Sequence, residues 1–224
     1  MVDFGRGWCS VSYTPEIAAA LSGATVRQLS YWRSLRTPEP LLRPEVYEPR
    51  SRVAYSFQDL LALRTFVYLL AHGVPLQRVR RAVRSLRAMG ETEHLSSYVL
   101  VAVGRDVVWR KSEDEAVDLT LHPRHEVIAR AIDILQPFSN QRDEVVVDLL
   151  IPKPGLRIDP EIRGGYPVIE GTRVPYDLVA SLCNDGMSPE EIAAIYPSVD
   201  ASAVQGAADF ATYVAERRRS STAA

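Results

Sequence analysis

Near the N-terminus, apolar residues recur every three or four positions in two short segments, a spacing typical of one face of a helix. The first segment, residues 13–21, contains the cap residue Thr14 followed by Pro15, and both favour a helix start. The second segment, residues 26–35, follows the cap residue Thr25, and a Ser-Gly-Ala turn joins the two segments. The pattern therefore predicts a helix-turn-helix. Its second helix turns five polar side chains outward: Arg27, Gln28, Ser30, Tyr31 and Arg33.

Two longer helices are predicted after a proline-rich stretch. Four prolines between residues 37 and 55 prevent a long helix and favour an extended loop or a β-wing. Ser56 then caps a predicted helix over residues 57–72, which Gly73 ends. The next predicted helix ends at Gly90 and carries an apolar stripe with five arginines on its other faces.

The pattern changes in the middle of the chain, where runs of apolar residues favour strands. Residues 97–111 predict a hairpin that turns at 104–106, residues 126–135 are compatible with a helix, and residues 144–151 predict a strand. Capping residues and apolar periodicity then predict three C-terminal helices, at 176–185, 188–196 and 200–218.

Together these elements predict a mainly α chain with small β elements, an α+β fold class. It would contain a winged helix-turn-helix, a middle β-rich α/β segment and a C-terminal β-hairpin with a three-helix homeodomain-like domain. We expect five parts: an N-terminal extension at 1–12, the winged-helix domain at 13–90, the middle segment at 91–150, the C-terminal domain at 151–216 and a frayed basic tail at 217–224.

The formal net charge of −2 conceals an uneven distribution along the chain. Residues 25–90 carry twelve arginines, no lysine and four acidic residues, whereas residues 91–224 carry 13 basic and 22 acidic residues. A basic block on an otherwise acidic chain indicates contact with a polyanion such as DNA, although a solvated helix face has the same composition. Charge alone leaves both interpretations open.

Little in the sequence indicates metal, cofactor or catalytic chemistry. Cys9 and Cys183 are the only cysteines, too few for a disulfide framework, which is typical of a reducing cytoplasm. His122 and His125 are three positions apart and Glu126 follows the second, but Pro123 lies between the histidines and no third ligand is clear. The first ten residues do not resemble an export signal, and no apolar run approaches the ~20 residues of a membrane helix. We therefore expect a cytoplasmic protein with no metal, cofactor, membrane contact or enzymatic activity.

The order of motifs over residues 13–89 resembles the MerR family of winged-helix DNA-binding proteins. The resemblance rests on the aromatic pair in the second helix, on the junction from Arg52 to Tyr55-Ser-Phe-Gln-Asp-Leu, and on a Gly-Val-Pro-Leu corner between two helices. It implies that the second helix enters the major groove while the wing clamps the DNA backbone. By resemblance, Arg27, Tyr31 and Arg33 take the groove role, and Arg50, Arg52 and Tyr55 form the wing clamp. Gln28 and Ser30 of the second helix can also bond to bases or the backbone. With the cap residue, we expect nine DNA-contacting residues: Thr25, Arg27, Gln28, Ser30, Tyr31, Arg33, Arg50, Arg52 and Tyr55. Typical MerR sensors continue into a long coiled-coil helix, but here Gly90 interrupts the pattern and no cysteine is near, which argues against metal sensing.

The glycine-rich stretch RGGYPVIEGTRV, residues 163–174, has neither the lysine of a P-loop nor the glycine spacing of a dinucleotide-binding turn. We expect a compact hairpin instead, with a tight reversal at Gly164-Gly165. Residues 148–216 closely resemble domain-of-unknown-function family 433, through this stretch and through the later Gly-Met-Ser-Pro-Glu-Glu-Ile motif.

A MerR-like region joined to a 433-type region resembles a VapB-type antitoxin of a bacterial type II toxin–antitoxin system. The resemblance implies a protein that neutralises a PIN-like ribonuclease toxin and autoregulates its operon by binding double-stranded DNA at its own promoter. Such a nuclease has an acidic, metal-binding centre, so an arginine on the hairpin is suited to neutralise it. We expect four residues to contact the toxin: Arg163, Tyr166, Glu170 and Arg173. In the alternative, Arg173 binds Asp177 or Glu170 within the hairpin.

Three functional interpretations follow. The first is an antitoxin that forms a homodimer through its middle segment, since one helix-turn-helix reads only a half-site. The second is a MerR-like one-component transcriptional regulator that responds to a small ligand. The third is an interaction adaptor with a degenerate winged helix. A neighbouring gene for a PIN-like protein favours the first, and a neighbouring efflux or enzyme gene favours the second.

Overall fold

A computed structural model of the chain describes residues 13–34, 40–44, 46–47, 53–89, 99–103, 106–110, 116–118 and 134–222. Several predicted features lie outside these ranges: the N-terminal extension 1–12, Cys9, Arg50, Arg52, His122, His125 and the predicted helix as far as residue 133.

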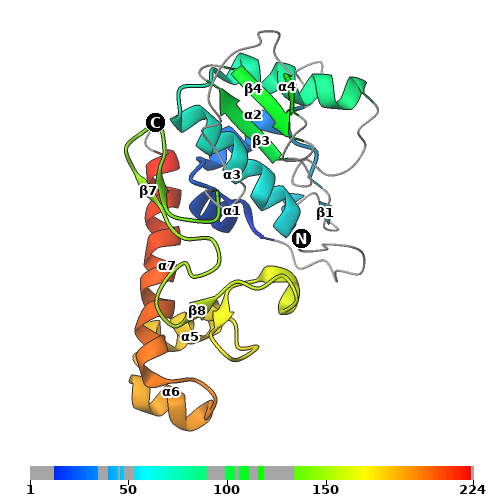
Figure 1. Cartoon of the computed structure of the whole chain (residues 1–224). Coiled ribbons are helices and arrows are strands. Elements are labelled where there is room, and N and C mark those ends of the chain that lie inside the picture. The colour runs from blue at the N-terminus through cyan, green and yellow to red at the C-terminus, as the bar shows by residue number, and fades with distance from the viewer. Residues whose placement is uncertain are drawn as a thin grey trace.

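The described part is mainly helical with small antiparallel strand pairs, which confirms the predicted α+β class (Figure 1). Its helices are α1 (Pro15–Ser22), α2 (Val26–Trp32), α3 (Phe57–Ala71), α4 (Leu76–Ala88), α5 (Tyr176–Asn184), α6 (Pro189–Ile195) and α7 (Ala201–Thr222). The strand pairs are β1 (Val46–Tyr47) with β2 (Val53–Ala54), β6 (Phe138–Ser139) with β7 (Val145–Val146), and β8 (Leu156–Arg157) with β9 (Val168–Ile169). A three-stranded sheet contains β3 (Val99–Val103), β4 (Asp106–Arg110) and β5 (Ala116–Asp118). None of the helices in the described ranges is long and apolar enough to cross a bilayer.

The helix-turn-helix begins and turns where the sequence predicts. The hydroxyl of Thr14 accepts a hydrogen bond from the N–H of Ile17 at the start of α1. At α2, the Thr25 hydroxyl accepts from the N–H of Gln28, and the Thr25 N–H donates to Gln28 Oε1 at 2.8 Å. This reciprocal pair is a capping box. Gly23, with φ of +78°, ends α1 and permits the tight turn.

In the middle segment, the predicted hairpin is present and the predicted strand is shorter than expected. β3 and β4 pair antiparallel, and β5 extends the sheet by a strand that the sequence did not indicate. The predicted strand over residues 144–151 is wrong beyond Val146. The reason is Asp148, whose Oδ1 accepts hydrogen bonds from the N–H groups of Leu150 and Ile151, at 2.8 Å each, and so turns the chain.

The three C-terminal helices also occur as predicted, but the basic tail differs. α7 packs along α1, α5 and α6 and continues to Thr222, so the predicted fraying from residue 217 is wrong over this range (Figure 1). Arg217 is only 9% exposed: it donates to Glu144 Oε2 and, at 2.8 Å, to the carbonyl of Val145. Glu144, some seventy positions earlier in the sequence, therefore holds the C-terminal end of α7.

One core joins the first and the last parts of the chain. The buried hydroxyl of Tyr13 donates to the carbonyl of Gly165. The ring of Tyr166 stacks between those of Tyr13 and Tyr176, with centroid distances of 6.4 and 5.9 Å. Further along α7, the hydroxyl of Tyr213 donates to the carbonyl of Ala20 in α1, at 3.2 Å. The first helix of the helix-turn-helix is therefore braced by the C-terminal helix as well as by α3.

Arg64 of α3 is a fully buried cation that binds backbone carbonyls instead of a carboxylate. Its guanidinium donates to five carbonyl groups: those of Leu21, Ile134, Leu135, Gln136 and Val147. Burial lowers the pKa of Arg64 to about 10, which leaves the side chain cationic at neutral pH. One side chain thereby connects α1, α3 and the segments on either side of the β6–β7 hairpin.

Candidate nucleic-acid interface

The outer face of α2 presents polar and aromatic side chains to solvent. Arg27 and Ser30 are exposed, and Tyr31 is 51% exposed, whereas Leu29 and Trp32 on the inner face are each 1% exposed. This division follows the 3.6-residue helical repeat, which sets the buried pair against α1 and α3. The structure therefore brings three of the predicted DNA-contacting residues together on one surface.

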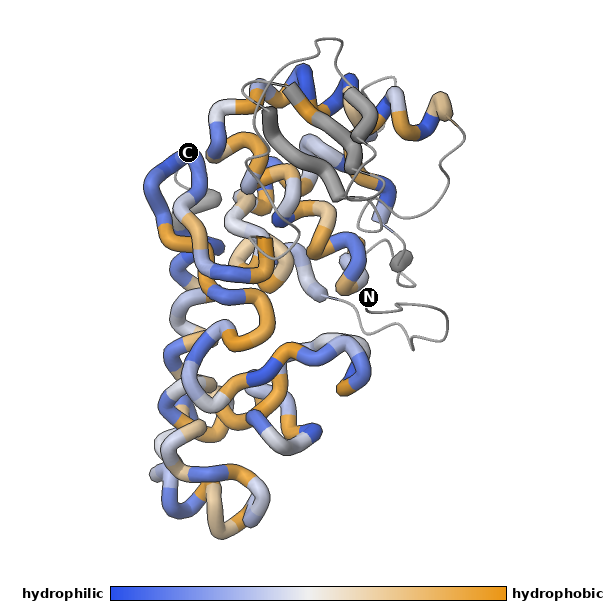
Figure 2. Tube along the Cα trace, in the orientation of Figure 1, coloured by the Kyte–Doolittle hydropathy of each residue, from blue (hydrophilic) through white to orange (hydrophobic). Residues whose placement is uncertain are grey.

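The arginine-rich helix α4 extends this surface. Its polar and apolar positions alternate along the helix (Figure 2). The guanidinium carbon of Arg80 lies 5.1 Å from the ring centre of Tyr31, a cation–π contact between α4 and α2. Arg81 and Arg84 are exposed on the same helix. None of the α4 arginines is among the nine predicted DNA contacts, although their three- and four-residue spacing is visible in the sequence.

Two of the predicted DNA-contacting residues are engaged in shaping the turn. Thr25 and Gln28 form the capping box, so their hydroxyl and amide oxygens are already occupied. Gln28 is nevertheless only half-buried, and its amide nitrogen remains available for a ligand.

The predicted wing is present as a short antiparallel pair in which Val46 faces Ala54. The assignment of Tyr55 to backbone clamping requires correction, because its side chain is 0% exposed and belongs to the core. Burial raises the pKa of Tyr55 to about 12, and the nearby charge of Arg33 opposes this rise. Arg33 is thus half-buried beside the Tyr55 hydroxyl rather than fully on the outer face. The sequence did not reveal this burial because Tyr55 pairs with Tyr13, more than forty residues away.

A second candidate surface lies on the glycine-rich hairpin. Its reversal is as predicted, with positive φ angles at Arg163 (+49°), Gly164 (+60°) and Gly165 (+89°) in the short turn η2 (Arg163–Gly165). Arg163 and Arg173 are both exposed on this hairpin. Its other expected contact residues, Glu170 and Tyr166, are exposed and half-buried, respectively.

The alternative internal ion pair of Arg173 is absent from the described part of the chain. Asp177 instead accepts a hydrogen bond from the hydroxyl of Tyr166, at 3.0 Å. Burial, together with the charges of Tyr176 and Asp177, raises the pKa of Tyr166. Tyr166 therefore has a structural role in the aromatic stack, while the two arginines remain directed to solvent.

Within the described ranges, no group of three or more His, Cys, Asp and Glu side chains is arranged to hold a metal ion. The one candidate ligand pair of the sequence, His122 and His125, lies outside those ranges.

Two family models match separate parts of the chain. Residues 13–86 match the MerR HTH family regulatory proteins, and residues 156–211 match a protein of unknown function, DUF433. A solved structure, Rv2018 from Mycobacterium tuberculosis, superposes with a TM-score of 0.51 at 15% identity and covers 91% of this chain and 100% of that one. At this identity the likeness concerns the fold alone.

Curated relatives match over a shorter span. The chain is 35% identical over 109 residues to the uncharacterized HTH-type transcriptional regulator Rv1830 of Mycobacterium tuberculosis, which corresponds to 49% of this chain and 48% of the relative. It is 38% identical over 95 residues to the uncharacterized protein y4eO of Sinorhizobium fredii, or 42% of this chain and 40% of that protein. The matches thus span about half or less of these relatives. The chain thus joins, within one fold, a region that matches the MerR HTH family to a region that matches DUF433.

Proposed function

We propose that the protein is a transcriptional regulator that reads double-stranded DNA with α2. The observation that carries this proposal is the exposed Arg27–Tyr31 face of a capped helix, continued by the arginines of α4. A face of this kind suits the major groove, where arginine recognises guanine and phosphate. The names of the HTH-type relatives support the same role. Because one α2 helix reads one half-site, we further propose that the protein binds DNA as a homodimer in the bacterial cytoplasm.

Replacing Arg27 with alanine is expected to weaken binding to the promoter of its own operon. The loss of a base contact in the major groove costs about 1–3 kcal/mol, or roughly 5- to 150-fold in Kd. Fluorescence anisotropy with a labelled promoter duplex measures this change. Arg173→Ala is the matched control, since this arginine is exposed on the C-terminal hairpin, and its Kd should stay at the wild-type value. If wild type does not bind the duplex at 50 mM salt, or if Arg27→Ala binds it with the wild-type Kd, the assignment of α2 to DNA binding is wrong.

The finer proposal is that the regulator is an antitoxin that neutralises a PIN-like ribonuclease. This proposal is supported by the exposure of Arg163 and Arg173 on a hairpin. The tight turn of that hairpin has three consecutive positive φ angles. An ordered hairpin loses little backbone entropy when it presents a cation to an acidic catalytic centre, and a guanidinium can bind a carboxylate in bidentate fashion. In this role the protein needs no catalytic activity of its own.

The double substitution Arg163→Ala, Arg173→Ala is expected to weaken the complex with the cognate PIN-like protein. Truncating buried, charge-paired side chains at an interface costs about 2–5 kcal/mol, so Kd should rise by roughly 30-fold or more. Co-purification and titration calorimetry with the PIN-like protein encoded beside this gene measure the effect, with Arg218→Ala on α7 as the control. If the double variant binds with the wild-type affinity, the hairpin is not part of the interface. If wild type forms no complex, the remaining proposal is a MerR-like transcriptional regulator that responds to a small ligand. The name of the relative Rv1830 supports only the role of transcriptional regulator.

A further inference from the structure

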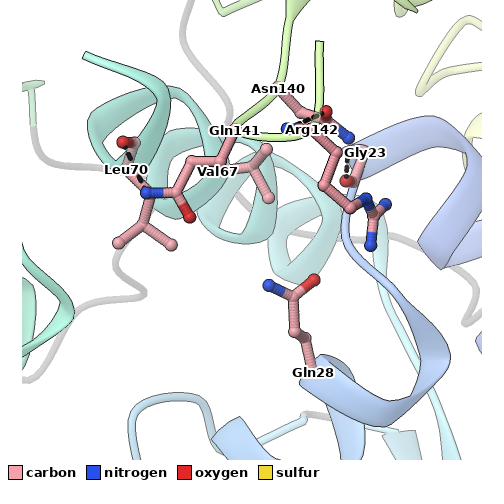
Figure 3. A pocket seen from close by; sticks show the side chains of 7 residues that line it. All are labelled: Gly23, Gln28, Val67, Leu70, Asn140, Gln141 and Arg142. Carbon is pink, nitrogen blue, oxygen red and sulfur yellow. Dashed lines mark hydrogen bonds between the residues drawn. The ribbon is translucent and has the colours of Figure 1, made fainter. Parts of the chain in front are cut away.

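A small, half-open pocket with a cavity volume of about 40 Å³ lies where the helix-turn-helix meets the β6–β7 hairpin (Figure 3). Its walls come from Gly23 in the turn, Gln28 of α2, two residues of α3 and the hairpin loop at residues 140–142. This loop lies outside both matched family regions, 13–86 and 156–211. The two family resemblances therefore do not assign it a role.

The hairpin loop is fixed against the helix-turn-helix by several contacts. Asn140 is 5% exposed, and its Nδ2 donates to the carbonyl of Gly23 at 3.0 Å. Gln141 Nε2 donates to the carbonyl of Leu70 at the end of α3, at 2.8 Å (Figure 3). A Cβ atom at Gly23 would lie 2.3 Å from Val146 Cγ2, so the turn and β7 are in direct contact. These contacts hold the pocket next to the start of α2.

Gln28 and Arg142 keep hydrogen-bond donors in this pocket, and among the described side chains that line it the one acceptor without a hydrogen-bond partner is Oε1 of Gln141. Gln28 Oε1 is occupied by the N–H of Thr25, so the opposite end of this amide, Nε2, is the group left for a ligand. Asn140 Oδ1 is likewise occupied, by the N–H groups of Arg142 and Glu144. Of the described residues that line the pocket, none is acidic. Such a lining matches an anion with several acceptor oxygens.

Arg142 supplies the positive charge at this site. Its side chain is 39% exposed, and its Nε and Nη2 donate to Glu144 Oε2 at 3.1 and 2.7 Å, which leaves Nη1 without a partner among the described residues. Although partial burial raises the pKa of Glu144, hydrogen bonds from Asn140 and Arg142 and the charge of Arg217 lower it overall. The Glu144 carboxylate is therefore shared between two arginines. Asp143 is exposed beside them but does not line the pocket.

We propose that this pocket receives a phosphate group of the DNA backbone, held by Arg142 Nη1 and Gln28 Nε2. The proposal rests on the proposed DNA-binding function of α2. The major groove is about 12 Å wide, so a helix within it has phosphates along both flanks. Gln28 follows Arg27 and lies on one flank of the exposed face, next to the pocket. A phosphate contact there fixes the register of α2 on the duplex and adds affinity whatever the base sequence.

The test compares the salt dependence of promoter binding for wild type, Arg142→Gln, Arg142→Lys and Arg173→Gln between 50 and 300 mM KCl, by fluorescence anisotropy. The loss of one phosphate contact lowers the slope of log K against log salt by about 1. We expect this loss for Arg142→Gln, equally on the promoter and on a scrambled duplex. Arg142→Lys keeps the charge and should retain the slope, and Arg173→Gln should match wild type. Circular dichroism establishes that each variant has the wild-type helix content.

Two results would overturn the inference and are distinguishable from failure of the proposed function. If wild type binds DNA with a steep slope and Arg142→Gln has the same slope, the pocket does not contact the duplex, although the role of α2 stands. If titration calorimetry shows that inorganic phosphate binds wild type but not Arg142→Gln while the DNA slopes are equal, the pocket serves a free phosphate instead. If wild type itself does not bind DNA, the proposed function and this contact fail together.

Discussion

Replacing Arg64 with methionine is expected to lower the free energy of unfolding by about 3–5 kcal/mol, the range found when one partner of a buried charged network is removed. Removing the cation relieves its desolvation, which by itself would stabilise the fold. The opposing effect is larger, because the buried carbonyl of Leu21 and four partly buried carbonyls lose this donor. Among them, the carbonyl of Leu135 has a second donor, the N–H of Leu149. An unsatisfied buried group costs about 1–3 kcal/mol before relaxation. Methionine fills the volume but offers no hydrogen to these carbonyls.

Thermal and urea unfolding followed by circular dichroism measures the effect of Arg64→Met. For a chain of this size, 1 kcal/mol shifts Tm by about 2–4 °C, so a drop of roughly 6–20 °C is expected. Arg64→Lys retains the charge but has three donors on one nitrogen, and should fall between wild type and Arg64→Met. The exposed Arg173→Met is the matched control and should stay within about 0.5 kcal/mol of wild type. A change below 1 kcal/mol for Arg64→Met would mean that the carbonyl groups find other donors at little cost.

Gly206→Ala is expected to destabilise the protein by about 3 kcal/mol, at the upper end of the range for overpacking. Helix propensity alone predicts the opposite sign, since alanine in a helix interior is favoured over glycine by about 1 kcal/mol. The geometry decides against propensity, because a Cβ atom at Gly206 would lie 1.9 Å from the carbonyl oxygen of Pro154. That oxygen belongs to the backbone and cannot rotate away. Nearby, a Cβ at Gly155 would lie 2.7 Å from the Cα of Ala203, so the loop has little room to retreat.

The same unfolding measurements test Gly206→Ala, with Thr212→Ala as its control. Thr212 is exposed on the same helix, so its replacement changes propensity without a clash and should have an effect within about 0.5 kcal/mol. A more stable Gly206→Ala variant would imply that the contact between α7 and the loop before β8 is looser than 1.9 Å indicates. Equal loss in both variants would mean that the clash at Gly206 is not the cause, since alanine raises helix propensity at both positions.

The candidate interface was predictable to different degrees for different residues. Arg27, Ser30 and Tyr31 were found from the sequence because their exposure follows from the helical repeat once the caps are located. The burial of Tyr55 and the half-burial of Arg33 were not, because they depend on pairing with the segment that begins α1. Arg80 was visible only as one of several arginines on α4 until its contact with Tyr31 set it apart. The phosphate pocket combines α2, α3 and the hairpin loop, three segments that no local pattern relates.

The sequence by itself determined the elements whose causes are local. Caps at Thr14, Thr25 and Ser56 fixed three helix starts, and glycines fixed the turns at residues 23 and 164–165, because both effects act within three or four residues of the chain. Only the tertiary structure decided how the two ends interlock. Tyr13 meets Gly165 across 152 positions and Tyr213 meets Ala20 across 193, and such contacts depend on the shape of the packed core, which periodicity and composition do not encode.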